Sequence, residues 1–260
     1  MTTRQRLDVV MVECDLAESR NIAQRLIRAG EVRVDGQLVD KPSTRIPFDA
    51  RVTVIEKPPF VSRGGEKLDA ALERFHIHVA GAVVADVGAS TGGFTDCLLQ
   101  HGARRVYAID VGYGQLHWDL RQDPRVEVME RTNARHLLGL PERVHLVTVD
   151  VSFISLALVL PTVVGWIGPH GGVLALIKPQ FEAGRRDVEK GGVVRDARVH
   201  RRVLEDVLGA AAALDLGLRG LMQSPLRGPA GNTEFLAWWQ RGSEARDSDA
   251  AISACLAEIA

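Results

Sequence analysis

The pattern of apolar and polar positions divides the chain into two parts with different rhythms. Near the N-terminus, apolar residues recur at helical spacing from Leu7, and a second helix follows "AESR". Residues 29–56 then alternate like short strands around turns at Asp35-Gly36 and Lys41-Pro42. This part is expected to form a small α+β domain over residues 1–57.

From about residue 61, apolar strand candidates alternate with helix candidates, which is typical of buried parallel strands in an α/β fold. A helix over about 197–214 is followed by two consecutive strands, "GLRGLMQSPL" and "TEFLAWWQR", and a short helix. The two strands predict an antiparallel hairpin at the edge of the sheet. The expected strands before it are 82–89, 105–112, 125–131, 144–151 and 172–179.

The composition is that of a globular protein. The chain has 260 residues, of which 46% are hydrophobic and 25% charged, and its formal net charge is -1. A surface for a polyanion must therefore be local. The three cysteines are far apart and form neither a metal-binding pair nor a disulfide framework, which fits a reducing cytosol.

Neither a signal peptide nor an uncharged apolar stretch long enough for a membrane span is visible in the sequence. We therefore expect a cytoplasmic protein without a metal ion and without stable membrane association. "KPPF" ends the first unit, because two prolines continue neither a helix nor a central strand. We expect a linker over residues 58–64 and a second domain over 65–260.

The first strand of the second domain ends in "DVGASTGGFTDCL". Glycines at such a turn let backbone N–H groups approach a ligand at the start of a helix. The next strand ends at Asp110, where a carboxylate suits the two hydroxyls of a ribose. The spacing is not that of a dinucleotide loop, so S-adenosylmethionine is the expected cofactor. A purely structural turn is the alternative.

Asn133, in "ERTNAR", is expected to contact the adenine, to cap a helix, or to do both. The complete set of candidate cofactor-binding residues is Asp86, Gly88, Ala89, Ser90, Gly92, Gly93, Phe94, Asp110, Asn133 and Asp150.

Charged residues stand at strand ends, where the carboxyl edge of a parallel sheet binds ligands. Asp150 and Lys178 end two strands, Glu234 begins the last one, and Lys67 lies just before the first helix of the domain. Because the last strand is expected to run antiparallel, Glu234 returns to the same edge. Structural salt bridges with outward-pointing lysines are the alternative to a catalytic network.

These motifs resemble the FtsJ-type RNA ribose 2′-O-methyltransferases, and more closely the TlyA family, which has been labelled a hemolysin A family. The resemblance rests on "VSRGGEKL", "DVGASTGGFTD", "AIDVGYGQL", "ERTNAR", "DVSFISL", "KPQFEAG" and "GNTEFLAW". Residues 1–57 resemble the S-four RNA-binding domain. The resemblance implies a Rossmann-like methyltransferase fold, with a seven-stranded, mostly parallel sheet whose last strand is antiparallel. A small α+β domain precedes it in the sequence.

By this resemblance, the catalytic tetrad is Lys67, Asp150, Lys178 and Glu234. The implied reaction moves a sulfonium methyl group to the ribose 2′-OH of cytidine in ribosomal RNA. Lys178 is expected to contact the 2′-oxygen, as base or as charge stabiliser, and Asp150 to orient Lys178 and help remove the proton. Methylation of a base amino group is disfavoured because "VSF" follows Asp150, where that chemistry uses two prolines and an aromatic residue.

Two basic segments are candidate RNA contacts. The first unit carries arginines at helical spacing, with a solvated helix face as the alternative. Residues 184–202 hold seven Lys/Arg against three Asp/Glu and are expected to form a mobile loop at the mouth of the site. The candidate RNA-binding residues are Arg4, Arg6, Arg20, Arg25, Arg28, Arg33, Arg63, Arg185, Arg186 and Lys190.

The expected partners are ribosomal RNA or ribosomal subunits. Three other functions remain open at this point: a membrane-active hemolysin, an RNA-binding assembly factor with an inactive methyltransferase fold, and a pseudouridine synthase. The last would not need the glycine loop and Asp110, and the intact tetrad argues against the second.

Overall fold

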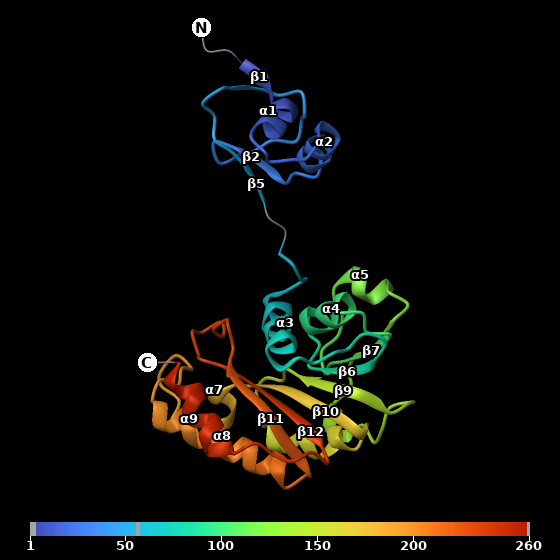
Figure 1. Cartoon of the computed structure of the whole chain (residues 1–260), viewed down its shortest axis with the longest axis vertical. Helices are drawn as coiled ribbons and strands as arrows, with labels where there is room; N and C mark the ends of the chain where they lie inside the picture. The colour runs from blue at the N-terminus through green and yellow to red at the C-terminus, as the bar shows by residue number, and fades with distance from the viewer. Residues whose placement is uncertain (1–3, 56–57, 259–260) are drawn as a thin grey trace. The chain divides into compact units, whose positions relative to one another are not determined.

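The computed structural model describes residues 4–55 and 58–258, and its contacts divide the chain into two compact units, Met1–Pro58 and Pro59–Ala260 (Figure 1). Residues 56–57, where the expected first domain ends, lie outside the described residues. The domain limits drawn from the sequence stay a prediction.

The first unit combines two helices with short antiparallel strands, as the sequence predicts. Helices α1 (Leu7–Glu13) and α2 (Arg20–Arg28) pack together, and Ser19 caps α2 by accepting the backbone N–H of Ile22. The strands pair as β3-β2-β5 and as β1-β4. Their bounds are β1 Arg4–Arg6, β2 Val32–Val34, β3 Gln37–Leu38, β4 Arg45–Pro47 and β5 Val52–Val54.

The core of the first unit is small and apolar. Leu7 and Met11 of α1 and Ala23 and Ile27 of α2 are fully buried, and Val32 joins them from the sheet. These positions repeat every three or four residues along each helix, which is why one face of each helix is buried.

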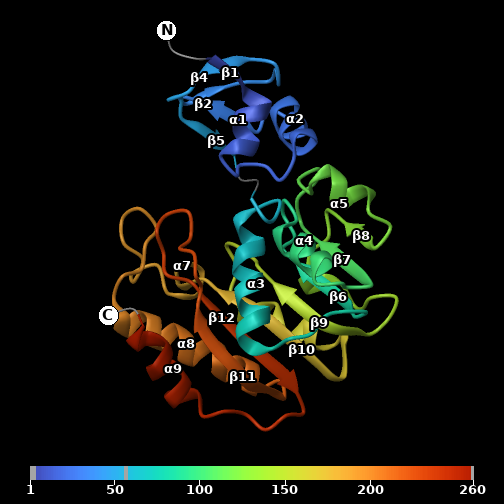
Figure 2. The ribbon, with the colours of Figure 1, turned by 45° about the horizontal axis from the view of Figure 1, so that its top comes forward.

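The second unit is built on one seven-stranded sheet in the order β11-β12-β10-β9-β6-β7-β8 (Figures 1 and 2). Strand β12 pairs antiparallel with both of its neighbours, and the other pairs are parallel. The sequence prediction of the sheet is thereby confirmed. The strands are β6 Val83–Val87, β7 Arg105–Ile109, β8 Val126–Met129, β9 Val144–Val149, β10 Ile167–Ile177, β11 Leu216–Gln223 and β12 Phe235–Arg241.

Helices cover both faces of this sheet (Figure 1). Apolar side chains of α3 and α4 form one buried cluster with the sheet, and those of α6, α8 and α9 form another on the opposite face. Along β6, Val83, Ala85 and Val87 join the second cluster and Val84 the first, because successive strand residues point to opposite faces. The helices are α3 Arg63–Phe75, α4 Gly93–Gln100, α5 Trp118–Gln122, α6 Leu160–Val164, α7 Pro179–Glu182, α8 Ala197–Ala212 and α9 Ser248–Ala257, with single 3-10 turns at Ala134–His136 and Leu156–Leu158.

Two elements differ from their predicted positions. Lys67 lies inside α3, whose N-cap is Ser62, and not before the helix. Gly64 and Gly65 belong to this helix, and the missing side chain of Gly65 makes room for Phe60, because an added Cβ would stand 2.2 Å from the Phe60 ring. Strand β10 starts five residues earlier than predicted and is irregular between Ile167 and Gly172.

The antiparallel direction of β12 brings its first residues to the carboxyl edge of the sheet. Phe235 pairs with Ile177, so Glu234 stands beside the end of β10 where Lys178 follows. Within the part of the chain that the structure describes, no helix combines the length and the apolar character that crossing a membrane requires.

Candidate active site

The turn after β6 is shaped by the close approach of two backbones. Gly88 has φ +85°, and a Cβ added there would stand 2.4 Å from the carbonyl oxygen of Asp150. Only glycine satisfies both conditions without strain. The turn therefore lies directly against the end of β9, and the predicted cofactor loop and Asp150 share one place.

Asp86, a candidate cofactor contact, is the penultimate residue of β6. Its carboxyl group is fully buried, accepts hydrogen bonds from the hydroxyls of Thr95 (2.7 Å) and Thr148 (3.1 Å), and lines neither cavity of the site. Burial raises the pKa of Asp86 to about 7. Asp86 ties β6 to α4 and β9, and we assign it to the support of the loop rather than to contact with a ligand.

Asp110 ends β7 and holds the loop from the other side. One carboxylate oxygen accepts the backbone N–H of Ser90 at 2.8 Å, and the other accepts that of Gly112 at 2.6 Å. Each oxygen has a second lone pair, so the carboxylate can still accept two hydroxyl groups.

A cavity of about 440 Å³ opens beside Asp110. Its polar lining includes Asn133, and its apolar lining includes Ile109, Val111 and Ile154. Asn133 also caps the short turn at Ala134–His136 by accepting the backbone N–H of Arg135. The cap that the sequence suggests for Asn133 is therefore present, and the same residue lines the cavity.

A second cavity of about 610 Å³ adjoins the first and shares Gly88, Ser90, Asp150 and Phe153 with it. All four residues of the predicted tetrad line it: Lys67, Asp150, Lys178 and Glu234. Of the candidate cofactor residues, Ala89, Gly93 and Phe94 line it as well.

The tetrad forms two ion pairs. Lys67 Nζ donates to Glu234 Oε2 at 2.6 Å, and both side chains are almost fully buried. Lys178 Nζ lies 2.6 Å from Asp150 Oδ1 and donates to Ser152 Oγ at 3.0 Å. Oδ1 of Asp150 is buried and its close partner is the Lys178 ammonium, so the two side chains form an ion pair at the cavity.

Two phenylalanines that line the tetrad cavity, Phe153 and Phe181, are not among the residues predicted from the sequence. Phe153 is 89% exposed, and its ring lies 4.8 Å from the ring of Phe181, centroid to centroid. The Lys178 ammonium stands 5.9 Å from the Phe181 ring. A large exposed aromatic ring at a cavity is unusual. The signal in the sequence is a phenylalanine three residues after the strand-end Asp150.

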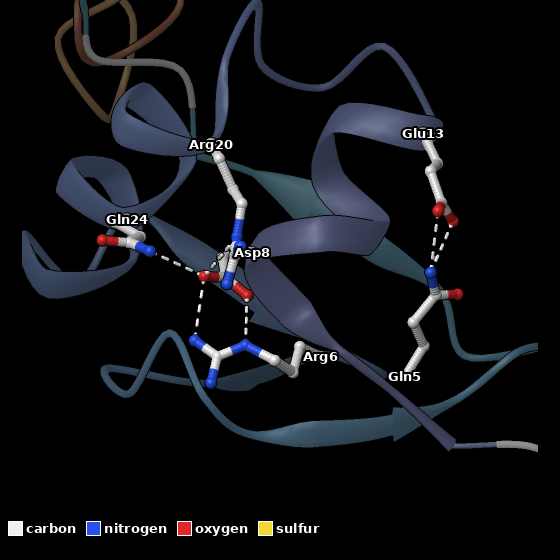
Figure 3. A network of polar contacts seen from close by, with 6 residues as sticks. All are labelled: Gln5, Arg6, Asp8, Glu13, Arg20 and Gln24. Carbon is white, nitrogen blue, oxygen red and sulfur yellow. Dashed lines mark hydrogen bonds and ion pairs between the residues drawn. The ribbon is translucent and has the colours of Figure 1, made fainter.

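The arginines of the first unit fall into two groups. Arg6 and Arg20 converge with Gln24 on the fully buried carboxylate of Asp8 (Figure 3). These contacts hold the pKa of Asp8 well below its usual range, with the Arg6 hydrogen bond as the largest cause. Arg6 and Arg20 thus stabilise the first unit by pairing with the buried Asp8, whether or not they also contact RNA.

Arg25 and Arg28 lie exposed on α2 without a carboxylate partner among the described residues, and Arg4 is exposed on β1. Arg33 is exposed as well and donates to the carbonyl of Gly36. These four guanidinium groups remain accessible to phosphates.

The basic segment 184–202 is less free than its composition suggests. Its last six residues begin α8, and Arg195, Arg198 and Arg202 form ion pairs within or near the segment. The three named candidates of this segment are exposed and form no ion pair among the described residues, but they line neither cavity: Arg185, Arg186 and Lys190. Arg63, by contrast, lines the tetrad cavity.

One other cluster has metal-binding residue types. The ligand atoms of Asp69, Cys97 and His101 lie within 4.8 Å of one another. The His101 ring bonds to Asp69 at 2.6 Å, and burial raises the pKa of the Cys97 thiol. We assign no ion to the cluster.

The sheet order and the loop at its carboxyl edge define a Rossmann-like methyltransferase fold for the second unit. The family model of the FtsJ-like methyltransferase matches residues 60–241, and that of the S4 domain matches residues 5–52. The chain belongs to the TlyA family of FtsJ-like methyltransferases, which confirms the resemblance read from the motifs.

Individual relatives agree with this assignment. The chain is 48% identical over 242 residues to the 16S/23S rRNA (cytidine-2′-O)-methyltransferase TlyA of Mycobacterium tuberculosis, covering 92% of this chain and 90% of that protein. It is 40% identical over 237 residues to Hemolysin A of Brachyspira hyodysenteriae, covering 89% of this chain and 98% of that protein. A solved structure titled "Putative hemolysin from Streptococcus thermophilus" superposes with a TM-score of 0.75 at 41% identity, covering 99% of this chain and 96% of that one.

Proposed function

We propose that this protein transfers a methyl group from S-adenosylmethionine to the ribose 2′-OH of cytidine in ribosomal RNA. The observation that carries the proposal is the arrangement of Lys67, Asp150, Lys178 and Glu234 as two ion pairs around one cavity beside the cofactor loop. The family membership and the printed activity of the Mycobacterium tuberculosis relative support the same reaction.

The two adjoining cavities fit the cofactor. Asp110 would accept the ribose hydroxyls, Asn133 would meet the adenine, and the loop from Gly88 to Gly93 would hold the methionine end. The turn at Gly88 has to be a glycine, because any side chain there would collide with the backbone of Asp150. When bound, the cofactor supplies an electrophilic methyl group on a sulfonium sulfur.

Lys178 and Asp150 handle the proton and the charge of the acceptor. The 2′-oxygen forms the new C–O bond, the C–S bond breaks with its electron pair going to sulfur, and the hydroxyl proton has to leave. Lys178 takes that proton if it is neutral. If it is an ammonium, it stabilises the developing negative charge and the proton passes to Asp150, whose carboxylate lines the same cavity.

Lys67 and Glu234 act on position rather than on the proton. Both are buried and paired, so their geometry is rigid and their charges offset each other. We assign them to fixing the target ribose in line with the methyl group, a contribution that orientation alone makes large.

The first unit would bind the RNA that the second unit methylates. The S4 model matches it, and its exposed arginines are suited to backbone phosphates. Ribosomal RNA or a ribosomal subunit is the proposed partner, and the reaction then takes place in the cytoplasm.

The test is nucleoside mass spectrometry of ribosomal RNA incubated with the protein and S-adenosylmethionine. We expect 2′-O-methylcytidine as the new nucleoside. A cytidine methylated on the base, or RNA without any new methyl group, would contradict the proposal. Leakage of liposomes caused by the purified protein would favour the hemolysin alternative instead.

A further inference from the structure

The tetrad cavity carries two positive charges that nothing in it neutralises. Its charged lining consists of four cations, Arg63, Lys67, Lys178 and Arg227, and two anions, Asp150 and Glu234. The two carboxylates are already paired with the two lysines. The excess therefore resides on Arg63 and Arg227, which form no ion pair among the described residues and are both exposed.

The cofactor does not remove this excess. The amino-acid end of S-adenosylmethionine contains one ammonium and one carboxylate, which cancel, and its sulfonium adds a further positive charge. With the cofactor bound, the cavity would be more positive still. The missing negative charge must come from the other substrate.

The geometry brings the two arginines to one place. Arg63 is the first residue of α3, and its Nη2 donates to the backbone carbonyl oxygen of Arg227 at 2.9 Å. Arg227 lies in the loop between β11 and β12, and its Nη1 donates to the carbonyl oxygen of Gly231. Each guanidinium has five N–H donors, so most of them remain for a ligand.

The loop is held against the catalytic residues. The backbone N–H of Gly228 donates to Asn232, and a Cβ added at Gly228 would stand 2.5 Å from Glu234 Oε1. The residue after Arg227 thus packs directly on the tetrad. This contact fixes Arg227 at the rim of the cavity in which the target ribose is proposed to lie.

We propose that Arg63 and Arg227 form a phosphate-binding site for the RNA backbone next to the target nucleotide. Arg227 is the new element of this site, and it acts as a positioning residue. A planar guanidinium binds a phosphate through two parallel hydrogen bonds, and two of them around one phosphodiester would fix the sugar that it carries. The inference rests on the proposed function, since it takes RNA as the second substrate.

The experiment compares steady-state methylation of transcribed ribosomal RNA by the wild type, Arg227→Gln, Arg227→Lys and the control Arg74→Gln. Arg74 is exposed at the far end of α3, so the control removes the same charge away from the cavity. For Arg227→Gln, we expect the KM for RNA to rise about tenfold, as for the loss of one hydrogen bond to a charged group, while kcat and the KM for S-adenosylmethionine stay within about twofold.

Salt dependence gives a second readout. Losing one phosphate contact on a single strand should reduce the slope of log affinity against log salt by about 0.7 for Arg227→Gln, and Arg227→Lys should restore the slope. An unchanged KM for RNA with an unchanged slope would overturn the proposal. A raised KM for S-adenosylmethionine instead would show that the site binds the cofactor carboxylate.

Binding of a fluorescein-labelled RNA to the full-length variants separates this inference from the proposed function. If the wild type transfers no methyl group, the proposed function fails, and the salt slope of binding still tests the phosphate site. A wild type that methylates RNA as expected, beside an Arg227→Gln variant with wild-type binding and KM, would refute the phosphate site alone.

Discussion

Replacing Asp86 by asparagine is expected to make the second unit more stable at neutral and alkaline pH. Asp86 is fully buried and its partners are two hydroxyl groups, Thr95 and Thr148. An asparagine has nearly the same shape, and since a hydroxyl both donates and accepts, both contacts can persist in the variant. The exchange removes only the ability of the side chain to become charged.

The size of the effect follows from the pKa of Asp86. Burial raises it to about 7 from the ordinary 3.8. The folded protein therefore retains a proton that the unfolded chain releases, and this contribution to stability is complete below pH 4 and is lost as the pH rises through 7. A difference of about three pKa units corresponds to about 4 kcal/mol.

Denaturant unfolding at pH 4 to 8 measures this effect. All four tryptophans of the chain, at positions 118, 166, 238 and 239, belong to the second unit, so their fluorescence follows that unit alone. The stability of Asp86→Asn relative to the wild type should grow by about 4 kcal/mol from pH 4 to pH 8. Parallel pH profiles of the two proteins would show that Asp86 does not titrate in this range, and would refute the reasoning.

Three further predictions concern the two units separately. Phe153→Ala should lower kcat/KM for RNA about tenfold or more, because stacking of an aromatic ring on a base contributes about 1–3 kcal/mol. Calorimetry should show an unchanged affinity for S-adenosylmethionine, and a wild-type kcat/KM in the variant would exclude a stacking role. Asp8→Asn should lower the free energy of unfolding of the first unit by about 2 kcal/mol at neutral pH, measured as faster hydrogen exchange of residues 4–55. Because the pKa of Asp8 is lowered in the folded state, the difference in stability between variant and wild type should narrow as the pH falls below 4. The double variant Arg25→Gln, Arg28→Gln should weaken RNA binding and reduce its salt slope by about 1.4 without changing the circular dichroism spectrum, and wild-type binding would assign these residues to a solvated helix face.

The alternation of strands and helices along the second unit is readable from the sequence because the buried strands are continuous apolar runs. The place of Glu234 is readable for the same reason: two consecutive strands imply a hairpin, and the antiparallel strand returns its start to the edge that carries Lys178. The meeting of Asp150, Lys178 and Glu234 at one edge thus follows from topology, whereas the place of Lys67 inside α3 does not.

Other features depend on contacts between distant segments, which a linear pattern does not contain. The hydrogen-bond partners of Asp86, which are Thr95 on α4 and Thr148 on β9, are brought to it by the fold, and the strand pattern does not reveal them. The arginines of the first unit look alike in the sequence, but only Arg6 and Arg20 reach the buried Asp8. Arg227 stands alone in a Gly/Pro loop, and only the bond from Arg63 and the close approach of Gly228 to Glu234 show that the loop closes on the cavity.

The central claim is that Lys178, held by Asp150, acts on the 2′-oxygen. Its most direct test is the single-turnover rate of methyl transfer to ribosomal RNA by Lys178→Ala, with S-adenosylmethionine and RNA both saturating and their binding measured separately. We predict a rate at least about 100-fold below that of the wild type, as for the loss of a general base or of a preorganised charge, with the affinity for the cofactor unchanged. A wild-type rate in the variant would contradict the claim.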